Sequence, residues 1–386
     1  FGQDSSFAGN KTAQGNSDAN GIGDFYYAPP AGFLALCTQN LPDATVIPSE
    51  HFNTVLYTGD GTTSHTITGV NFQPDFTWIK QRNGTSNHVL HDSVRGTVGG
   101  EYLQMYSDTT AAETTQGDGD GVLSLDSDGF TVGYNNSLAW NASGQTYVAW
   151  NWKANGAGVS NTDGTITSTV SANVDAGFSI VTMEASAGVR TVGHGLTKSP
   201  ELIIYKSRTS SAAYWQVLAQ EVNNGNGHLG RLALQLTSAW VVALSTWNDT
   251  KPTSSVFTLG TSSTEKGVAY CFHSVDGYSK VGSYTGNGST DGTFVHCGFR
   301  PAYVMWKRTD SVAVWVIQDT TRDGGNTSNS RIEANSSAAE ATDNANIDML
   351  SNGFKMRQPY GYVNSSGATY IFLAFAESPF KNSNAR

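Results

Sequence analysis

The chain has 386 residues, of which 42 are glycine and only 14% are charged, and its formal net charge is −10. Average soluble proteins carry roughly 25% charged residues, and a protein that binds nucleic acid without sequence preference needs a basic surface. No apolar run approaches the length of about 18 residues that marks a membrane-spanning helix. We therefore expect neither nucleic acid nor a membrane as a partner.

Three cysteines, Cys37, Cys271 and Cys297, cannot all pair with one another. Cys271 and Cys297 lie in strand-like apolar runs, and free cysteine is among the most buried residue types. We interpret all three as small core residues. Their odd number favours folding in a reducing cytoplasm over a disulfide-stapled secreted scaffold.

Residues 1–42 begin with Phe-Gly-Gln, continue through a polar segment, and end in an aromatic, proline- and glycine-containing run at residues 25–36. This pattern resembles the closing segment of a SPRY domain, a β-sandwich found in phage proteins. The resemblance implies that the earlier strands of that sandwich precede Phe1, where the sequence has no initiator methionine. Residues 43–51, with Pro48, are expected to form an extended linker.

The rest of the chain contains one pattern three times, at residues 74–81, 200–207 and 301–308. A proline opens a run of large apolar or β-branched residues, which is typical of the first residue of a strand because proline has no amide proton. A lysine stands six places after each proline, at Lys80, Lys206 and Lys307. We expect each lysine to return the strand to solvent.

Each copy continues with a second apolar run that is expected to pair back as a hairpin, and it closes on a third run that looks buried. Asp-Gly or Asn-Gly turns precede Phe130 and Phe354, but the second copy lacks this signature. The pattern predicts an all-β fold of tandem β-sandwiches, jelly-roll or lectin-like, with three internal repeats of roughly 100 residues. The predicted divisions are repeats at 52–154, 178–275 and 276–386 and a linker or ribbon at 155–177.

Helices are expected to be few and short. Short Ala-rich stretches at residues 109–114 and 336–341 predict a turn or two of helix in loops. The connection between the second and third copies is so short that we expect these two to pack in a fixed orientation.

Most aromatic residues fall in the predicted strands, and we assign these to the core: Trp78, Trp150, Trp152, Trp306, Trp315 and Phe375. Aromatic rings in loops are better candidates for stacking on the faces of sugars, with neighbouring amides as hydrogen-bonding groups. The predicted glycan-binding residues are Trp140, Tyr134 and Asn135 in the first copy and Tyr360, Tyr362 and Asn364 in the third.

Metal and catalytic motifs find little support. The acidic stretch from Asp118 to Asp128 lacks the glutamate that a helical calcium loop places at its twelfth position. His88 and His91 are three apart in a strand, which puts them on opposite faces. No phosphate-cradling glycine loop or His-Glu-x-x-His motif occurs. We expect no metal, no cofactor and no catalytic residues.

Residues 277–288, 298–304, 347–354 and 370–381 look like an uncharacterised domain that recurs in virion proteins of marine tailed phages, and residues 191–196 match the same domain. The resemblance implies a non-enzymatic structural virion protein, part of a tail fibre or host-facing appendage. Its partners would be other copies of the chain, with a trimer favoured, other virion proteins, and a host-surface glycan or protein. It would be made in the host cytoplasm and displayed on the particle.

Three alternatives remain open. The same domains could decorate a capsid or form a head fibre without binding a receptor. An appendage enzyme that degrades polysaccharide is the alternative from another class. A secreted bacterial lectin is disfavoured by the unpaired cysteines.

Overall fold

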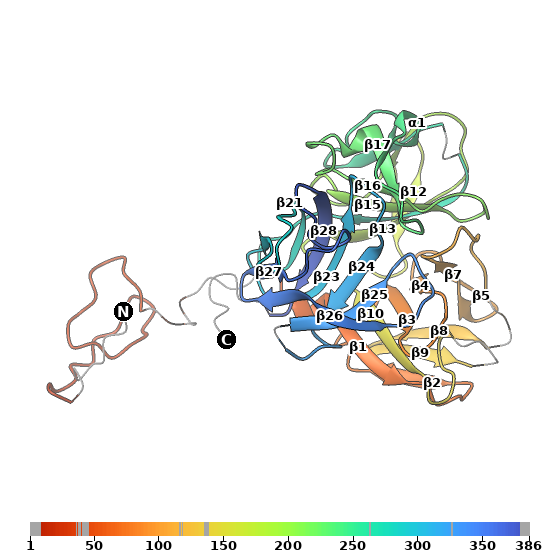
Figure 1. The fold of residues 1–386 in the computed structure, drawn as a ribbon. Helices are drawn as coiled ribbons and strands as arrows, with labels where there is room; N and C mark the ends of the chain where they lie inside the picture. The colour runs from red at the N-terminus through yellow and green to blue at the C-terminus, as the bar shows by residue number, and fades with distance from the viewer. Residues whose placement is uncertain are drawn as a thin grey trace. The chain divides into compact units, whose positions relative to one another are not determined.

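The computed structural model describes residues 9–35, 37, 40, 46–115, 117, 119–134, 139–261, 264–325 and 327–378, without the side chains of residues 343–346. The chain divides into two compact units, Phe1–Thr45 and Val46–Arg386 (Figure 1). No helix in these described ranges is long and apolar enough to cross a membrane.

The first unit is held together by turns around one carboxylate. Asn16 and Phe25 form a β-bridge, and Asp18 accepts hydrogen bonds from the backbone N–H groups of Ile22 at 2.9 Å and Ala35 at 2.7 Å. The Phe-Gly-Gln motif lies outside the described residues, so the SPRY resemblance stays a prediction. Cys37 is half-buried in this unit rather than fully buried.

The second unit is all-β and contains the three repeats, which we number repeat 1 (residues 52–154), repeat 2 (155–275) and repeat 3 (276–378). Strands of repeat 1 follow a 3-10 turn, η2 (Pro48–Glu50), and are β1 (Phe52–Thr58), β2 (His65–Thr68), β3 (Phe76–Gln81), β4 (Val89–Asp92), β5 (Thr97–Val98), β6 (Glu101–Tyr102), β7 (Gln104–Tyr106), β8 (Gly121–Asp126), β9 (Gly129–Gly133) and β10 (Thr146–Trp152). Elements of repeat 2 are β11 (Val159–Asn161), β12 (Ser168–Asn173), β13 (Phe178–Met183), β14 (Arg190–Gly193), β15 (Leu202–Ser207), β16 (Gln216–Ala219), η3 (Gly227–Leu229), β17 (Gly230–Ala233), β18 (Val241–Val242), α1 (Leu244–Trp247), β19 (Val256–Leu259) and β20 (Gly267–Phe272). Strands of repeat 3 are β21 (Ser279–Thr285), β22 (Phe294–His296), β23 (Pro301–Arg308), β24 (Trp315–Asp319), β25 (Thr327–Glu333), β26 (Ala341–Leu350), β27 (Gly353–Met356) and β28 (Thr369–Ala376).

All three repeats use the same antiparallel strand order in a front sheet. The orders are β1-β10-β3-β4-β7, β13-β20-β15-β16-β17 and β21-β28-β23-β24-β25. The predicted hairpins are confirmed, since β3 pairs with β4, β15 with β16 and β23 with β24. A back sheet, β2-β9-β8 in repeat 1, covers each front sheet, and in repeat 3 its strands β22, β27 and β26 continue from the front sheet.

Repeat 2 departs from this pattern at both ends. Residues 155–177, expected to be a linker or ribbon, contribute β11 and β12, which extend the front sheet beyond β13. The back sheet has only β14 and β19, and α1 packs against β19. The missing Asp-Gly signature of the second copy indicated this divergence. The predicted helices at 109–114 and 336–341 are wrong, because both stretches are irregular or extended.

The front sheets are buried on both faces, unlike those of a sandwich with one solvated side. Successive side chains of a strand point to opposite faces. Phe76 and Trp78 of β3 therefore enter a core shared by all three repeats, whereas Ile79 enters the core of repeat 1 alone. β15 and β23 divide their side chains in the same way, and in Figure 1 both lie toward the middle of the unit.

We call the shared cluster the central core. Among its members are Phe52, Trp78, Trp150, Trp152, Phe178, Leu202, Trp215, Phe272, Tyr303, Trp315 and Phe375. A void of only about 10 Å³ remains inside it, lined by residues of all three repeats. The six aromatic residues predicted to be core are confirmed as buried. Cys271 and Cys297 also lie in sandwich cores, of repeats 2 and 3.

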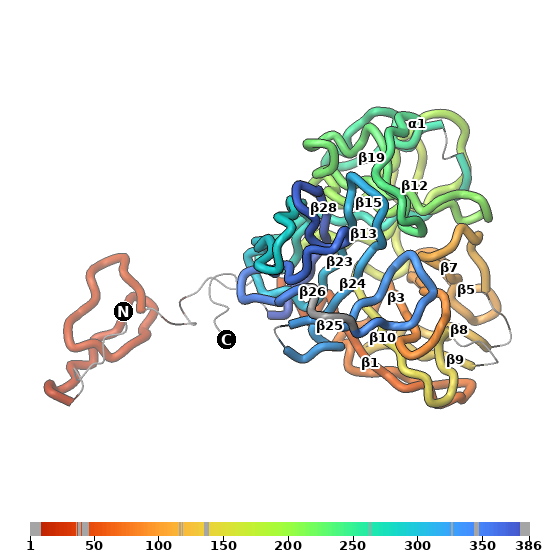
Figure 2. The backbone as a smooth tube through the Cα atoms, viewed as in Figure 1, coloured from red at the N-terminus to blue at the C-terminus, as the bar shows by residue number. Residues whose placement is uncertain are grey.

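The three repeats close head to tail around the central core. The Trp215 ring nitrogen of repeat 2 donates to the Tyr106 carbonyl of repeat 1 at 2.8 Å, and Trp315 of repeat 3 donates to the Ala233 carbonyl of repeat 2 at 3.0 Å. His88 of repeat 1 takes the equivalent position, with its Nε2 atom 3.0 Å from the Glu333 carbonyl of repeat 3. Figure 2 shows the backbone after β25 lying beside β3. The unit is a closed ring with approximate threefold symmetry.

The prediction that the repeat lysines reach solvent is wrong. Lys80, Lys206 and Lys307 are fully buried, with 0% of their surface exposed. Each ammonium donates to backbone carbonyls at the end of its own strand, at 2.6 Å to Gln81, 3.0 Å to Ser207 and 2.6 Å to Arg308. A buried charge is tolerated only when its hydrogen bonds are satisfied, and these carbonyls supply them.

Candidate functional site

The predicted glycan-binding residues do not all lie on the surface. Trp140 and Asn364 are completely buried. Trp140 packs in the core of repeat 1 near the ring of His91, with 6.4 Å between ring centroids. A ring without exposed surface cannot stack on a sugar, so both residues are structural.

Asn364 and its counterpart Asn141 clamp the loop that follows the first strand of their repeat. The Asn364 amide donates to Asn287 Oδ1 at 2.7 Å, and the Asn141 amide donates to Asp60 Oδ1 at 2.8 Å. Both loops follow the same three residues, Tyr57-Thr58-Gly59 in copy 1 and Tyr284-Thr285-Gly286 in copy 3, and each is thereby fixed to the segment before the closing strand.

Tyr360 and Tyr362 form the exposed aromatic surface of repeat 3, which we call the tyrosine pair. Their rings stack with 5.8 Å between centroids and 24° between planes, and Tyr360 is 41% exposed. The guanidinium carbon of Arg331 lies 5.0 Å from the centroid of the Tyr362 ring. An aromatic face beside a guanidinium offers both stacking and hydrogen-bond donors.

The loop of the tyrosine pair is held rigidly from below. Trp306 Nε1 donates to the Tyr362 carbonyl at 2.8 Å, and the Tyr370 hydroxyl donates to the Gly361 carbonyl at 2.8 Å. The Tyr284 hydroxyl donates to the next carbonyl, that of Val363, at 2.7 Å. Three buried donors therefore fix the backbone that carries the two rings, so little conformational entropy would be lost on binding.

The corresponding loop of repeat 1 is less well defined as a site. Tyr134 is half-buried at the end of β9, in the position that Gln358 takes after β27. Asn135 lies outside the described residues. The two predicted groups thus follow equivalent strands of two repeats, as expected, and among the described residues of these two loops the stacked aromatic pair lies in repeat 3.

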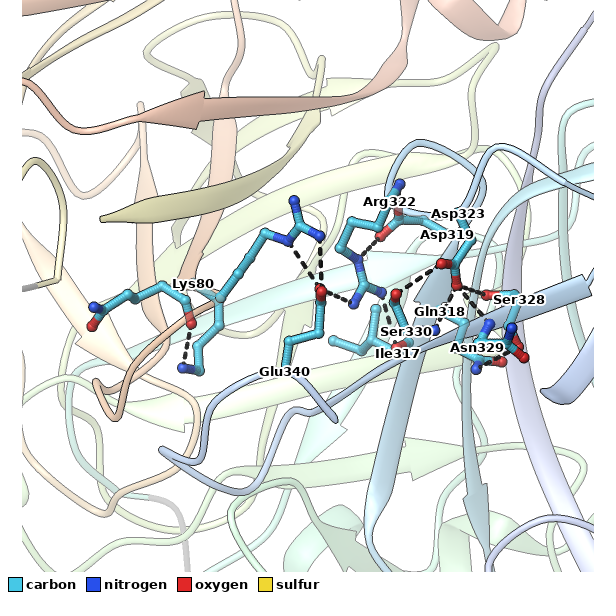
Figure 3. A network of polar contacts seen from close by, with 12 residues as sticks. Lys80, Ile317, Gln318, Asp319, Arg322, Asp323, Ser328, Asn329, Ser330 and Glu340 are labelled. Carbon is cyan, nitrogen blue, oxygen red and sulfur yellow. Dashed lines mark hydrogen bonds and ion pairs between the residues drawn. The ribbon is translucent and has the colours of Figure 1, made fainter. Parts of the chain in front are cut away.

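Polar networks at the junctions between repeats were not predicted. We name each junction by the two repeats that meet there. At junction 3–1, Glu340 of repeat 3 accepts from Arg82 of repeat 1 at 2.8 Å and from Arg322 at 2.9 Å (Figure 3). Arg322 also donates to Asp319 at 2.6 Å. The ring nitrogen of Trp150 of repeat 1 donates to the same aspartate at 3.0 Å.

Junction 1–2 repeats this arrangement. Glu113 accepts from Arg208 of repeat 2 at 2.8 Å and lies 3.4 Å from Arg95. Arg95 donates to Asp92 at 2.5 Å, and the Tyr270 hydroxyl of repeat 2 donates to Asp92 at 2.7 Å. The Asp-x-x-Arg spacing after the second strand of copies 1 and 3 is the sequence signal that could have revealed both networks.

Junction 2–3 has the same backbone geometry with apolar side chains. The backbone N–H of Trp240 donates to the Thr309 carbonyl at 2.8 Å. At the other two junctions, the backbone N–H of Glu113 donates to the Arg208 carbonyl and that of Glu340 to the Arg82 carbonyl. Ala219 and Val222 take the places of the aspartate and arginine, and Leu373 takes the place of Tyr270 and Trp150. One junction of the ring is therefore hydrophobic where two are ionic.

Burial and ion pairing act against each other on the junction charges. Burial alone would raise the pKa of Glu340, but the hydrogen bonds from Arg82 and the charge of Arg322 outweigh it and lower the pKa. Burial opposes the charged form of Arg322, yet Asp319 and Glu340 raise its pKa above the usual value. Ion pairing therefore favours the charged forms of Glu340 and Arg322 in the network between repeats 3 and 1.

The glycines beside the acidic stretch of repeat 1 are held by a carboxylate of β6. Glu101 accepts from the backbone N–H groups of Gly117 at 2.8 Å and Gly119 at 2.5 Å, while Asp118 lies outside the described residues. Within the described part of the chain, no group of three or more histidine, cysteine, aspartate or glutamate residues is placed to hold a metal ion. His88 and His91 point to opposite faces of β4, into the central core and the core of repeat 1, as predicted.

The chain belongs to the protein family described as domain of unknown function DUF7483, whose model matches residues 47–379. The match begins one residue after the start of the second unit and covers all three repeats as a single domain. No curated protein matches the chain.

Proposed function

We propose that this DUF7483 protein is a non-enzymatic structural component of a tailed-phage virion, part of a fibre or other host-facing appendage. The observation that supports it is the closed ring, in which each repeat buries one face of its front sheet in the central core and the other face in its own core. The resemblance of repeat 3 to a domain of phage virion proteins supplies the biological setting. The appendage would be assembled in the host cytoplasm and displayed on the particle.

The tyrosine pair is the proposed contact with a host-surface glycan or protein. Tyr360 provides the exposed ring, and Arg331 provides a cation beside Tyr362. Single contacts of this kind are weak, so attachment would gain strength from several copies on one particle. We propose a homo-oligomer, with a trimer favoured, that uses surfaces outside the ring because the ring itself is closed within one chain.

The test is binding of fluorescently labelled chain to intact host cells and competition with infection. Saturable binding that blocks infection is expected, and Tyr360→Ala should weaken it about tenfold while leaving the thermal unfolding midpoint unchanged. Tyr27→Ala, at a tyrosine of the first unit that is 66% exposed, is the matched control and should bind as the unchanged chain does.

Two outcomes would replace the proposal. Tight binding to phage heads without binding to cells would assign the chain to capsid decoration or a head fibre. If the chain shortens host polysaccharide on incubation, it would instead be an appendage enzyme that degrades polysaccharide. An unchanged affinity of Tyr360→Ala would remove the tyrosine pair as the contact surface but not the appendage role.

A further inference from the structure

Repeat 3 has an open groove between β21 and β22, the first strand of its front sheet and the first strand of its back sheet. The groove has a volume of about 310 Å³. Its lining includes Lys280, Ser283, Phe294, His296 and Phe372 of repeat 3, and Glu201 and Glu221 of repeat 2 lie at its side. In repeat 2 a strand fills the equivalent gap, and in repeat 1 a side chain bridges it.

In repeat 2 the gap is filled by a strand. β12 pairs antiparallel with β13 along its length, and the hydroxyl of Ser168 donates to the Gly193 carbonyl of β14 at 2.8 Å. Val170 of β12 is 4% exposed and belongs to the core of repeat 2. In repeat 1 the gap is bridged at one end by Asn53, whose amide donates to the carbonyls of Gly69 and Val70 at 3.2 Å.

The edge of β21 presents backbone groups to the groove. The Val281 N–H donates to the Ser274 hydroxyl at 3.0 Å, so the backbone of Val281 points away from β28. Residues of an antiparallel pair alternate between bonding their partner and pointing outward. The N–H and carbonyl of Ser283, two residues further, therefore point outward into the groove that this residue lines.

The groove could accommodate a strand like β12. Gly282 stands opposite Phe372, where repeat 2 has Val181 opposite Ala269. An added Cβ at Gly282 would lie 2.8 Å from the Phe372 ring, so the ring packs over the glycine, and only 3% of Phe372 is exposed at the groove. In repeat 2 Val170 pairs with Val181. An incoming β-branched residue opposite Gly282 would pack on Phe372 in the same way.

We propose that this groove binds an extended strand from a partner protein that has the alternation of β12, a β-branched apolar residue between serine or threonine residues. The strand adds antiparallel to β21 and closes the gap to β22. Backbone hydrogen bonds to Ser283 supply affinity, and the apolar residue over Phe372 supplies selectivity, as in other cases of strand addition.

The test uses the full chain and a fluorescein-labelled synthetic peptide with the sequence of residues 165–175, followed by fluorescence anisotropy. Saturable binding is expected, together with slower hydrogen exchange in β21. Ser283→Pro removes the outward N–H at an edge position where proline is tolerated, and it should weaken binding at least tenfold. Phe294→Ser, at a groove residue that is 43% exposed, should weaken binding at least threefold.

Leu56→Pro is the matched control, because Leu56 holds the place of Ser283 in repeat 1, where the Asn53 side chain bridges the gap. This variant should bind the peptide as the unchanged chain does. Absence of saturable binding, or unchanged binding by Ser283→Pro, overturns the proposal; if that variant does not fold, Phe294→Ser decides in the same way. Concentration-dependent dimerisation that Phe294→Ser abolishes would assign the groove to a second copy and also overturn the partner strand.

Discussion

At the scale of single residues, the buried lysines show how the sequence pattern can mislead. A lysine at the end of an apolar run normally marks the return to solvent, yet Lys80, Lys206 and Lys307 are fully buried. Burial lowers the pKa of Lys80 and Lys206 to about 8, and burial together with the charge of Arg308 lowers the pKa of Lys307 to about 7. Each folded-state pKa therefore lies below the value of 10.5 for a solvated lysine.

This shift predicts that stability rises with pH between about 7 and 10. In that range the unfolded chain binds more protons than the folded one, so the free energy of unfolding increases with pH. Above about pH 10 the trend should reverse, because burial raises the pKa of tyrosines such as Tyr147, to about 12. Urea unfolding at a series of pH values measures the profile.

Lys307→Met should flatten this rise by up to about 1.4 kcal/mol per pH unit, the contribution of one titrating group. Lys266→Met is the control, since that lysine is exposed and its loss should leave the slope unchanged. A profile for Lys307→Met parallel to that of the unchanged chain would show that the buried ammonium does not titrate in this range.

At the scale of elements, the strand pairs of the front sheets exchange large and small residues between repeats. Val55 faces Ala149 in repeat 1 and Val181 faces Ala269 in repeat 2, but Gly282 faces Phe372 in repeat 3. Close packing permits either pair as long as the total volume is conserved.

Gly282→Val alone should therefore cost about 1–3 kcal/mol through overpacking, and Phe372→Ala alone about 3–5 kcal/mol through the lost ring. The double variant restores the pair of the other repeats, so its cost should be smaller than the sum by at least about 1 kcal/mol. Denaturant unfolding of the four proteins gives the interaction energy, and simple additivity would contradict the cross-strand exchange.

The junctions offer a second test between elements. Arg95→Val should cost about 3–5 kcal/mol, because it leaves Asp92 buried without its partner. The double variant Asp92→Ala/Arg95→Val copies the residues of junction 2–3 and should regain at least half of that loss. If the double variant is less stable than the single one, the ionic and apolar junctions are not interchangeable.

Much of this architecture could be predicted from the sequence. The period-2 runs and turn dipeptides identified the hairpins, the closing strands and the buried tryptophans. The central core could not be predicted, because a strand such as β3 that is apolar on both faces does not reveal which face meets which partner. Trp140 was placed in a loop correctly, but loop position did not reveal its burial. The tyrosine pair was named from the sequence, whereas the groove depends on edges that only the folded chain brings together.

At the scale of the whole molecule, the ring makes the three repeats depend on one another. Each front sheet contributes one face to the central core, so an isolated repeat would expose Phe76 and Trp78 or their counterparts to water. Burial of a large apolar side chain contributes about 1.5–3 kcal/mol, and each repeat has several at this surface. Repeats within the ring should therefore unfold together.

The most direct measurement of that claim is native-state hydrogen exchange of β10, β20 and β28, which are equivalent interior strands of the three front sheets. We predict the same opening free energy for all three, and an equal decrease in all three when Arg322→Val breaks junction 3–1. Opening of β28 and β10 at a lower free energy than β20, or a decrease confined to repeats 1 and 3, would contradict the account and show three sandwiches that are linked but fold separately.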